Sequence, residues 1–223
     1  METAHKSGSV LKILSIIIFL ILLVIPGYVF FAERGGLSFF ADADFKTLAH
    51  LIFPIFGLYA FFLVWLQIVL GASMPLFRKL FNYINSIHKI KGIFALSVAF
   101  IHPLFLLMAI GLTKYRNFEY VSDKMKVFAL FGTLAFILII ITALTALLMK
   151  LPWLRRKWKL IHYLNYVIFV LVFIHSWNLG SDVQSTGLKY LWFFYGITAI
   201  AAIIYRLWRV VQLRKKHVLA QQT

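Results

Sequence analysis

Long apolar runs constrain the fold of this chain more than any other feature of its sequence. A helix of about 18 or more apolar residues can cross a bilayer, and the 223 residues contain six candidate spans. Only 13% of the residues are charged, against about 25% in soluble domains. We therefore predict an all-α integral membrane bundle of six transmembrane helices. The expected spans cover residues 10–32, 47–73, 87–113, 125–149, 158–178 and 187–209.

The segments between these spans are short. None is long enough to bury a core of its own, so we expect one membrane domain over residues 1–223, centred on residues 47–210, and no nucleotide-binding domain. The chain has no cysteine, which excludes disulfides, iron–sulfur clusters with Cys ligands, c-type haem attachment and thiol catalysis. It also lacks Walker A, G-x-G-x-x-G and H-E-x-x-H motifs.

Lys and Arg are distributed unequally between the two ends of the predicted helices. Sixteen of the 23 lie near the chain termini or in the loops that follow the second and fourth spans, whereas six of the seven acidic residues lie on the opposite side. Cytoplasmic loops are enriched in Lys and Arg, so we expect both termini in the cytoplasm and the chain in the inner (plasma) membrane. The net charge of +16 then indicates contact with anionic lipid rather than nucleic acid, with an acidic electron-donor protein as the sharper alternative.

Histidines mark two of the predicted spans at two depths. His88 and His102 are 14 residues apart in the third span, and His162 and His175 are 13 residues apart in the fifth. Histidine inside a span is rare and usually functional. Both spans follow a cytoplasmic loop, so His88 and His162 lie near the inner surface, and the other two lie about four turns further out. Two helices that each supply one imidazole at each depth meet the requirement of two bis-histidine haems.

The two histidine spacings differ on a helical wheel. Fourteen residues of ideal helix leave His102 about 40° from the direction of His88, whereas 13 residues leave His175 about 140° from His162. Either the fifth span contains a π-bulge or local unwinding, or the two haems meet it from different sides. Matched depths on helices that run the same way still favour haem ligation over packing for these four residues.

The pattern His-x13-His, with His-x12-His two spans later, resembles the ferric reductase-like transmembrane domain family. This family includes the membrane halves of NADPH oxidases and yeast ferric reductases, and the haem-binding subunit of a bacterial methionine sulfoxide reductase system. The resemblance implies that His88 and His162 ligate the iron of an inner haem b, and that His102 and His175 ligate the iron of an outer one. It also implies that electrons cross the membrane through these two haems.

The resemblance further suggests where the electrons come from and where they go. Many family members continue into a cytosolic domain that binds FAD and NADPH. We expect no such domain within residues 1–223. The donor would then be a separate flavoprotein, a bound flavin or a quinol, and the acceptor would be ferric iron, oxygen or a periplasmic redox protein. In this interpretation the chain is the electron-transfer subunit of a membrane oxidoreductase and has no catalytic residues of its own.

Two other functions remain open from the sequence. A quinol-linked cytochrome b anchor of a respiratory enzyme, similar to cytochrome b561, would use the same haems, with His50, Gln67 or Asn165 at the quinone. A non-redox carrier or scaffold is the second alternative. Transport predicts broken helices with paired charges at mid-membrane, and no span has a charge at its middle.

Several further residues have more than one interpretation. His50 is an interfacial residue, a proton donor to an acceptor, or a substitute outer ligand. Phe169 lies between the macrocycles or simply packs, and Gly92 admits either a flat ring or a neighbouring helix. Pro103 removes the helical hydrogen bond to the carbonyl of Ala99, which can aim His102 or end a regular stretch.

Two sets of cations flank the predicted histidine pairs. They can bind haem propionates or extend to lipid phosphates. The inner set is Lys89, Lys91, Arg155, Arg156 and Lys159, and the outer set is Lys114, Arg116 and Lys189.

Overall fold

Helices account for most of the chain. The computed structural model describes residues 2–81 and 83–221; it is 87% helical, with no strand in this described part. The long helices are α1 (Glu2–Ala32), α2 (Phe45–Ala72), α4 (Ile84–Ile110), α6 (Lys126–Leu147), α8 (Leu164–Leu179) and α10 (Leu188–Ala220). The short elements are α3 (Met74–Leu80), α5 (Leu112–Arg116), α7 (Pro152–His162), α9 (Ser181–Ser185) and the 3-10 helices η1 (Leu37–Phe40) and η2 (Asp123–Met125). The prediction of an all-α fold is confirmed.

The number of membrane spans agrees with the sequence. Five helices of the described chain are long and apolar enough to cross a membrane, and α7 and α8 together make a sixth span that is bent by 40°. The bend lies at Tyr163, so the single helix expected over residues 158–178 is in fact two helices. The last helix is also longer than expected, because α10 continues to Ala220. Residues 210–220 contain neither Gly nor Pro, the two residues that most disfavour a helix.

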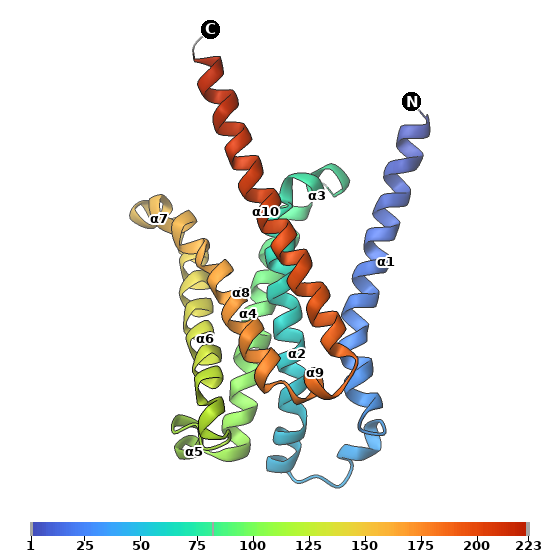
Figure 1. Cartoon of the computed structure of the whole chain (residues 1–223), viewed down its shortest axis with the longest axis vertical. Helices are drawn as coiled ribbons and strands as arrows, with labels where there is room; N and C mark the ends of the chain where they lie inside the picture. The colour runs from blue at the N-terminus through green and yellow to red at the C-terminus, as the bar shows by residue number, and fades with distance from the viewer. Residues whose placement is uncertain (1, 82, 222–223) are drawn as a thin grey trace.

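Helix α2 lies at the centre of the bundle (Figure 1). It packs along α4 on one side and against α10 on another, while α6 packs along α8. Trp192 and Tyr195 of α10 are fully buried, and the ring of Trp192 stacks on Phe61 of α2 with 4.8 Å between ring centres. The last helix therefore contributes two of the largest buried side chains of the described core.

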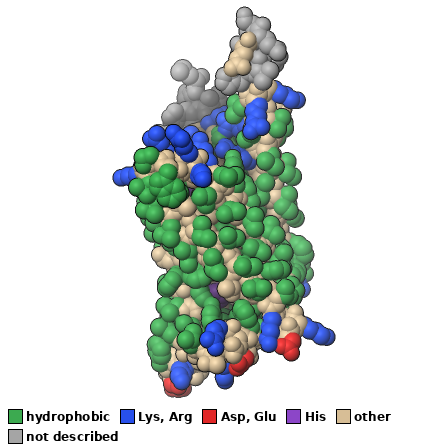
Figure 2. Space-filling view, turned by 90° about the vertical axis from the view of Figure 1, so that its left-hand side faces the viewer, with side chains coloured by type: hydrophobic (Ala, Val, Ile, Leu, Met, Phe, Trp, Pro, Cys, Tyr) green, Lys and Arg blue, Asp and Glu red, His purple; other side chains and the backbone are tan. Residues whose placement is uncertain are grey.

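Charged side chains gather at the two ends of the bundle. Figure 2 shows Lys and Arg side chains without Asp or Glu at the end of the bundle that holds α7, and Asp and Glu together with further Lys and Arg at the opposite end. We call the first the basic end and the second the acidic end. At the acidic end, Asp44 caps α2 by accepting a hydrogen bond of 2.8 Å from the backbone N–H of Thr47. The side chain of Thr47 and then this backbone N–H lower the pKa of Asp44. The segregation of charge predicted from the sequence is thus present in the fold.

Candidate functional site

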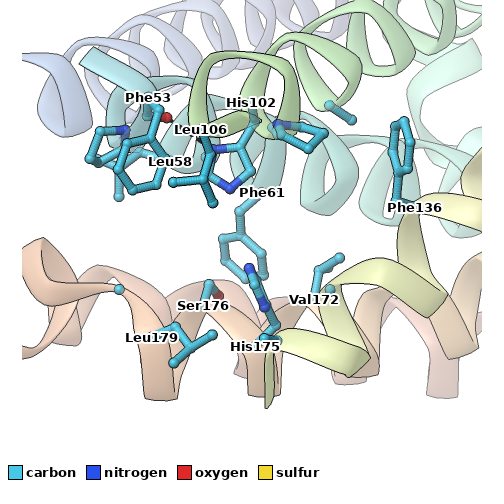
Figure 3. Close-up of a pocket in the computed structure, with 18 of the residues that line it drawn as sticks. Phe53, Leu58, Phe61, His102, Leu106, Phe136, Val172, His175, Ser176 and Leu179 are labelled. Carbon is cyan, nitrogen blue, oxygen red and sulfur yellow. Dashed lines mark hydrogen bonds between the residues drawn. The ribbon is translucent and has the colours of Figure 1, made fainter. Parts of the chain in front are cut away.

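Two of the four predicted ligands line one cavity in the half of the bundle nearer the acidic end. His102 of α4 and His175 of α8 extend into it from opposite walls, with Phe61 beside the gap between them (Figure 3). The cavity has a volume of about 270 Å³, and residues of α2, α4, α6 and α8 form most of its wall. We call His102 and His175 the cavity pair.

The backbone of a neighbouring helix fixes each imidazole of the cavity pair. Nδ1 of His102 lies 2.9 Å from the carbonyl oxygen of Phe53 in α2, and Nδ1 of His175 lies 2.9 Å from that of Phe128 in α6. A neutral imidazole that donates from Nδ1 has an unprotonated Nε2, which is the form that binds a metal. Both histidines therefore keep Nε2 as the free ligand atom.

Glycines in α2 and α6 leave room for these rings to lie against the backbone of those helices. A Cβ added to Gly57 would lie 2.8 Å from Cε1 of His102, and one added to Gly132 would lie 2.5 Å from Cε1 of His175. In each case the glycine follows the acceptor carbonyl by four residues, one helical turn. A side chain at either position would push the imidazole away from its carbonyl.

The other two predicted ligands face each other near the basic end, and we call them the basic-end pair. The ring centres of His88 and His162 are 6.2 Å apart and their planes differ by 79°. Two metal–imidazole bonds of about 2 Å each, together with the half-widths of two rings, give a separation of roughly 6 Å. The basic-end pair is therefore spaced as two axial ligands of one metal would be.

Side-chain amides surround the basic-end pair. Asn165 places Nδ2 3.0 Å from Nδ1 of His162 and donates to the His162 carbonyl at 2.8 Å. The hydroxyl of Thr142 donates to Oδ1 of Asn165 at 3.3 Å. Gln67 of α2 donates from Nε2 to the carbonyl of His88 at 3.0 Å. Two of the residues that the sequence offered for a quinone thus contact the predicted ligands instead.

Two further glycines bring α2 and α4 together at this level. A Cβ added to Gly71 would lie 3.4 Å from Cε1 of His88, and one added to Gly92 would lie 3.1 Å from Nε2 of Gln67. Of the two interpretations of Gly92, close helix packing is therefore the one that the structure supports.

The bend at Tyr163 accounts for the uneven spacing of the histidines. His162 ends α7 and His175 lies within α8, so a change of 40° in helix direction separates them. Local unwinding, one of the alternatives left open by the sequence, is what the chain uses. It lets both histidines face partners on the continuous helix α4.

Two tyrosines border the cavity toward the acidic end. Tyr115 and Tyr120 both line it, and their rings stack with centres 6.0 Å apart and planes within 16°. Burial raises the pKa of Tyr120 to about 12, and the neighbouring Tyr115 adds to the shift. Both phenols therefore stay neutral at physiological pH and supply hydroxyls rather than charges.

A buried ion pair lies at the same end. Asp182 of α9 is 6% exposed and lines the cavity. Arg34 binds both of its carboxylate oxygens, at 2.8 and 3.2 Å, and the guanidinium lies 3.8 Å from the ring centre of Phe30. The pair joins the segment after α1 to the wall of the cavity.

The flanking cations differ in burial. Of the five expected around the basic-end pair, only Lys91 is partly buried, and its Nζ lies 4.2 Å from the ring centre of Phe19. At the acidic end Lys114 and Arg116 are exposed, and Nζ of Lys189 lies 5.3 Å from the ring centre of Tyr190. None of these last three lines the cavity.

The remaining candidates have plainer surroundings. His50 is exposed, and its ring centre lies 5.6 Å from that of Phe53. Phe169 is buried and stacks on Phe61 at 5.8 Å. Pro103 lines the cavity next to His102. The side chains of the two terminal histidines, His5 and His217, lie outside the described residues.

The surroundings of the cavity pair fit a haem. The basic-end pair fits one in the spacing of its rings, but Nδ2 of Asn165 faces Nδ1 of His162, which leaves the hydrogen of that imidazole on Nε2. No group of three or more His, Cys, Asp or Glu side chains that could hold a metal ion occurs in the described chain. Each histidine pair offers two imidazoles, the number that a haem iron with two histidine ligands takes from a protein. The free Nε2 atoms of the cavity pair and the apolar walls around them meet the same requirement.

Sequence reasoning missed the groups that support the histidines. The glycines of α2 could have been found, because Gly57 and Gly71 are 14 residues apart, the same spacing as His88 and His102. Helices α2 and α4 are consecutive spans and run in opposite directions, so each glycine meets one histidine. No comparable sequence pattern predicts the Arg34–Asp182 pair, whose members are 148 residues apart.

Comparison with known proteins identifies the family to which this chain belongs. No curated protein and no solved structure matches the chain. The family described as "Ferric reductase like transmembrane component" matches residues 56–173, more than half of the chain. The match includes His88, His102 and His162 and ends two residues before His175. The chain is therefore a member of the ferric reductase-like transmembrane family.

Proposed function

We propose that this chain carries electrons across a membrane through two b haems, as the electron-transfer subunit of a membrane oxidoreductase. The family suggests membrane electron transfer, and its domains generally bind haem. We propose that the whole chain acts as one membrane domain. In it the basic-end pair holds the inner haem and the cavity pair holds the outer one.

The observation that carries this proposal is the pairing of the four histidines. Helix α4 supplies one imidazole to each pair, and the broken span α7–α8 supplies the other two. Fourteen residues of α4 correspond to about 21 Å of rise, within a hydrocarbon core of about 30 Å. The two pairs can thus divide one bilayer into two short electron steps.

The residues of the chain would hold the haems, orient the imidazoles and shield the outer site from water. Haem, when bound, supplies a one-electron iron couple whose axial ligands and surroundings set its potential. Hydrogen bonds to Phe53 and Phe128 hold the rings of His102 and His175 in one orientation and increase the basicity of their Nε2 atoms. Phe61, Val172 and Trp192 line the same cavity and exclude water from it.

The donor and the acceptor follow from the charge distribution. We propose that the basic end faces the cytoplasm, with both termini there and the chain in the inner (plasma) membrane. The exposed Lys and Arg of α7 would then face anionic lipid or an acidic flavoprotein donor. The acceptor, such as ferric iron, oxygen or a periplasmic redox protein, would be reduced at the acidic end.

A reduced-minus-oxidised absorption spectrum with haem counting tests the proposal. Protein purified from haem-replete cells should show a b-type spectrum with two haems per chain. A colourless protein would reject electron transfer and favour the carrier or scaffold. Rapid reduction by a quinol, but not by a reduced flavin or flavoprotein, would instead identify the quinol-linked alternative.

A further inference from the structure

Two buried polar atoms near the basic end have no hydrogen-bond partner. They are Oε1 of Gln67 and Nδ1 of His88, the buried side-chain atoms of the described residues that are left in this state. Buried polar groups are nearly always paired. Both atoms belong to one contact between α2 and α4, because Nε2 of the same Gln67 already binds the carbonyl of His88.

The two atoms are chemically complementary. A histidine that ligates a metal through Nε2 carries its hydrogen on Nδ1 and needs an acceptor there. Oε1 of an amide can only accept a hydrogen bond. Gln67 therefore presents an acceptor beside the one predicted ligand whose Nδ1 is unpaired.

The cavity pair indicates what is missing at His88, whereas Nδ1 of His162 faces the amide nitrogen of Asn165 instead. Each imidazole of the cavity pair donates from Nδ1 to a carbonyl oxygen of a neighbouring helix. His88 likewise lies on a glycine of a neighbouring helix, Gly71. Gly71 follows Gln67 by one turn, so Gln67 stands in α2 where Phe53 stands relative to Gly57. By this parallel, the backbone carbonyl of Gln67 would be the acceptor for His88. Nδ1 of His88 has no partner, so that carbonyl does not bind it, and the side-chain oxygen of the same residue is the acceptor left at this position.

We propose that Gln67 is a positioning residue for His88. Its Oε1 accepts the Nδ1 hydrogen of His88 when a metal is bound at Nε2, while its Nε2 keeps the bond to the His88 carbonyl. The amide thus holds both the backbone and the ring of one ligand. This inference rests on the proposed function, because it concerns the inner haem.

The proposal predicts the sign of a change in redox potential. An acceptor at Nδ1 makes an imidazole a stronger electron donor, which stabilises ferric iron and lowers the potential. Gln67→Met removes the acceptor at similar size, so the inner haem should become easier to reduce. We expect a change of about tenfold in its reduction equilibrium, equal to about 59 mV for one electron. Gln67→Glu keeps an acceptor oxygen, so its potential should lie at or below that of the wild type.

The experiment is a potentiometric titration of both variants and the wild type in detergent, with electron paramagnetic resonance of the ferric haems. A higher inner potential in Gln67→Met but not in Gln67→Glu supports the proposal, as does loss of the inner haem from the methionine variant alone. Unchanged potentials in both variants, a rise in both, or loss of the inner haem from both would overturn it. The outer potential should stay constant in every sample.

A matched control separates this role from a general effect of losing an amide. Asn178 of α8 donates to the carbonyl of Ile174 in its own helix at 2.8 Å. Asn178→Leu should leave the inner potential unchanged, and an equal shift there would overturn the assignment of Gln67. A wild-type protein with no haem at His88 would reject the proposed function. If the wild type binds two haems and the potential of the inner haem is the same in the Gln67 variants, this inference alone would be rejected.

Discussion

The two histidine pairs are held in different ways. The cavity pair donates to main-chain carbonyls of α2 and α6, whereas the basic-end pair is surrounded by the side-chain amides of Gln67 and Asn165. A substitution cannot remove a carbonyl of the main chain, but it can remove an amide. The fold therefore sets the surroundings of the first pair, and individual residues set those of the second. We expect the outer site to tolerate little change and the inner site to be adjustable.

The largest expected effect comes from removing a ligand of the cavity pair. His102→Ala or His175→Ala should abolish the outer haem and keep the inner one, because each site depends on its own two imidazoles. Haem content should fall to about half, as measured by haem counting and redox titration. His50→Ala is the control and should retain both haems. If either ligand variant kept both haems, the assignment of the cavity pair would be wrong.

Glycine substitutions test the difference between the pairs directly. Gly132→Ala places a Cβ 2.5 Å from the imidazole of His175, whereas Gly71→Ala places one 3.4 Å from that of His88. We expect the first change to displace the ring and weaken outer haem binding about 10- to 100-fold. The second should leave both haems bound. The haem that each variant retains during dilution in detergent distinguishes the two substitutions. If both variants lost haem equally, the two histidine pairs would be held in the same way.

The ion pair near the cavity should affect stability more than haem affinity. Asp182→Asn leaves Arg34 without its carboxylate, and breaking a buried pair of this kind costs about 3 kcal/mol. Thermal unfolding in detergent measures the loss. The double variant Arg34→Gln, Asp182→Asn should recover part of it, because the two residues are coupled. A loss below about 1 kcal/mol would indicate a solvated pair.

Two lysines near the basic-end pair give the smallest expected effects. Lys91 is partly buried one turn after His88, so Lys91→Gln should lower the inner potential, by a charge interaction on the order of 1 kcal/mol. Lys159 is exposed, and Lys159→Gln should leave both haem content and potential alone. Redox titration compares the two variants. Loss of the inner haem in the Lys159 variant would show that this residue binds haem and not lipid.

Much of the fold follows from the sequence, because the membrane restricts the possible structures. The apolar runs predict the spans to within a few residues, except that the fifth is broken at Tyr163 and the last helix continues to Ala220. The histidine spacing predicts that α4 contributes to two sites. The break at Tyr163 was open, since a π-bulge satisfies the same 13-residue spacing as local unwinding does. The length of α10 was underestimated because the sixth predicted span ends at residue 209, although the residues after it also favour a helix.

The supporting groups of the site were harder to predict. Gly57 and Gly71 repeat the spacing of the histidines, so that contact was available to sequence reasoning. The carbonyls of Phe53 and Phe128 carry no sequence signal, because every residue has a backbone oxygen. Arg34 and Asp182 meet only through the packing of α1 and α9, which no local pattern records.

The bend at Tyr163 attaches the two predicted sites to different layers of the lipid. Helix α7 bears exposed Trp153, Arg155 and Arg156, side chain types that settle among lipid headgroups, and it ends in His162. His175 lies in α8, whose side chains are mostly apolar. A thinner or thicker bilayer should therefore move His162 relative to His175. In the proposed function, such a shift would change the distance that an electron crosses between the two sites, and membrane composition would set the rate of that step.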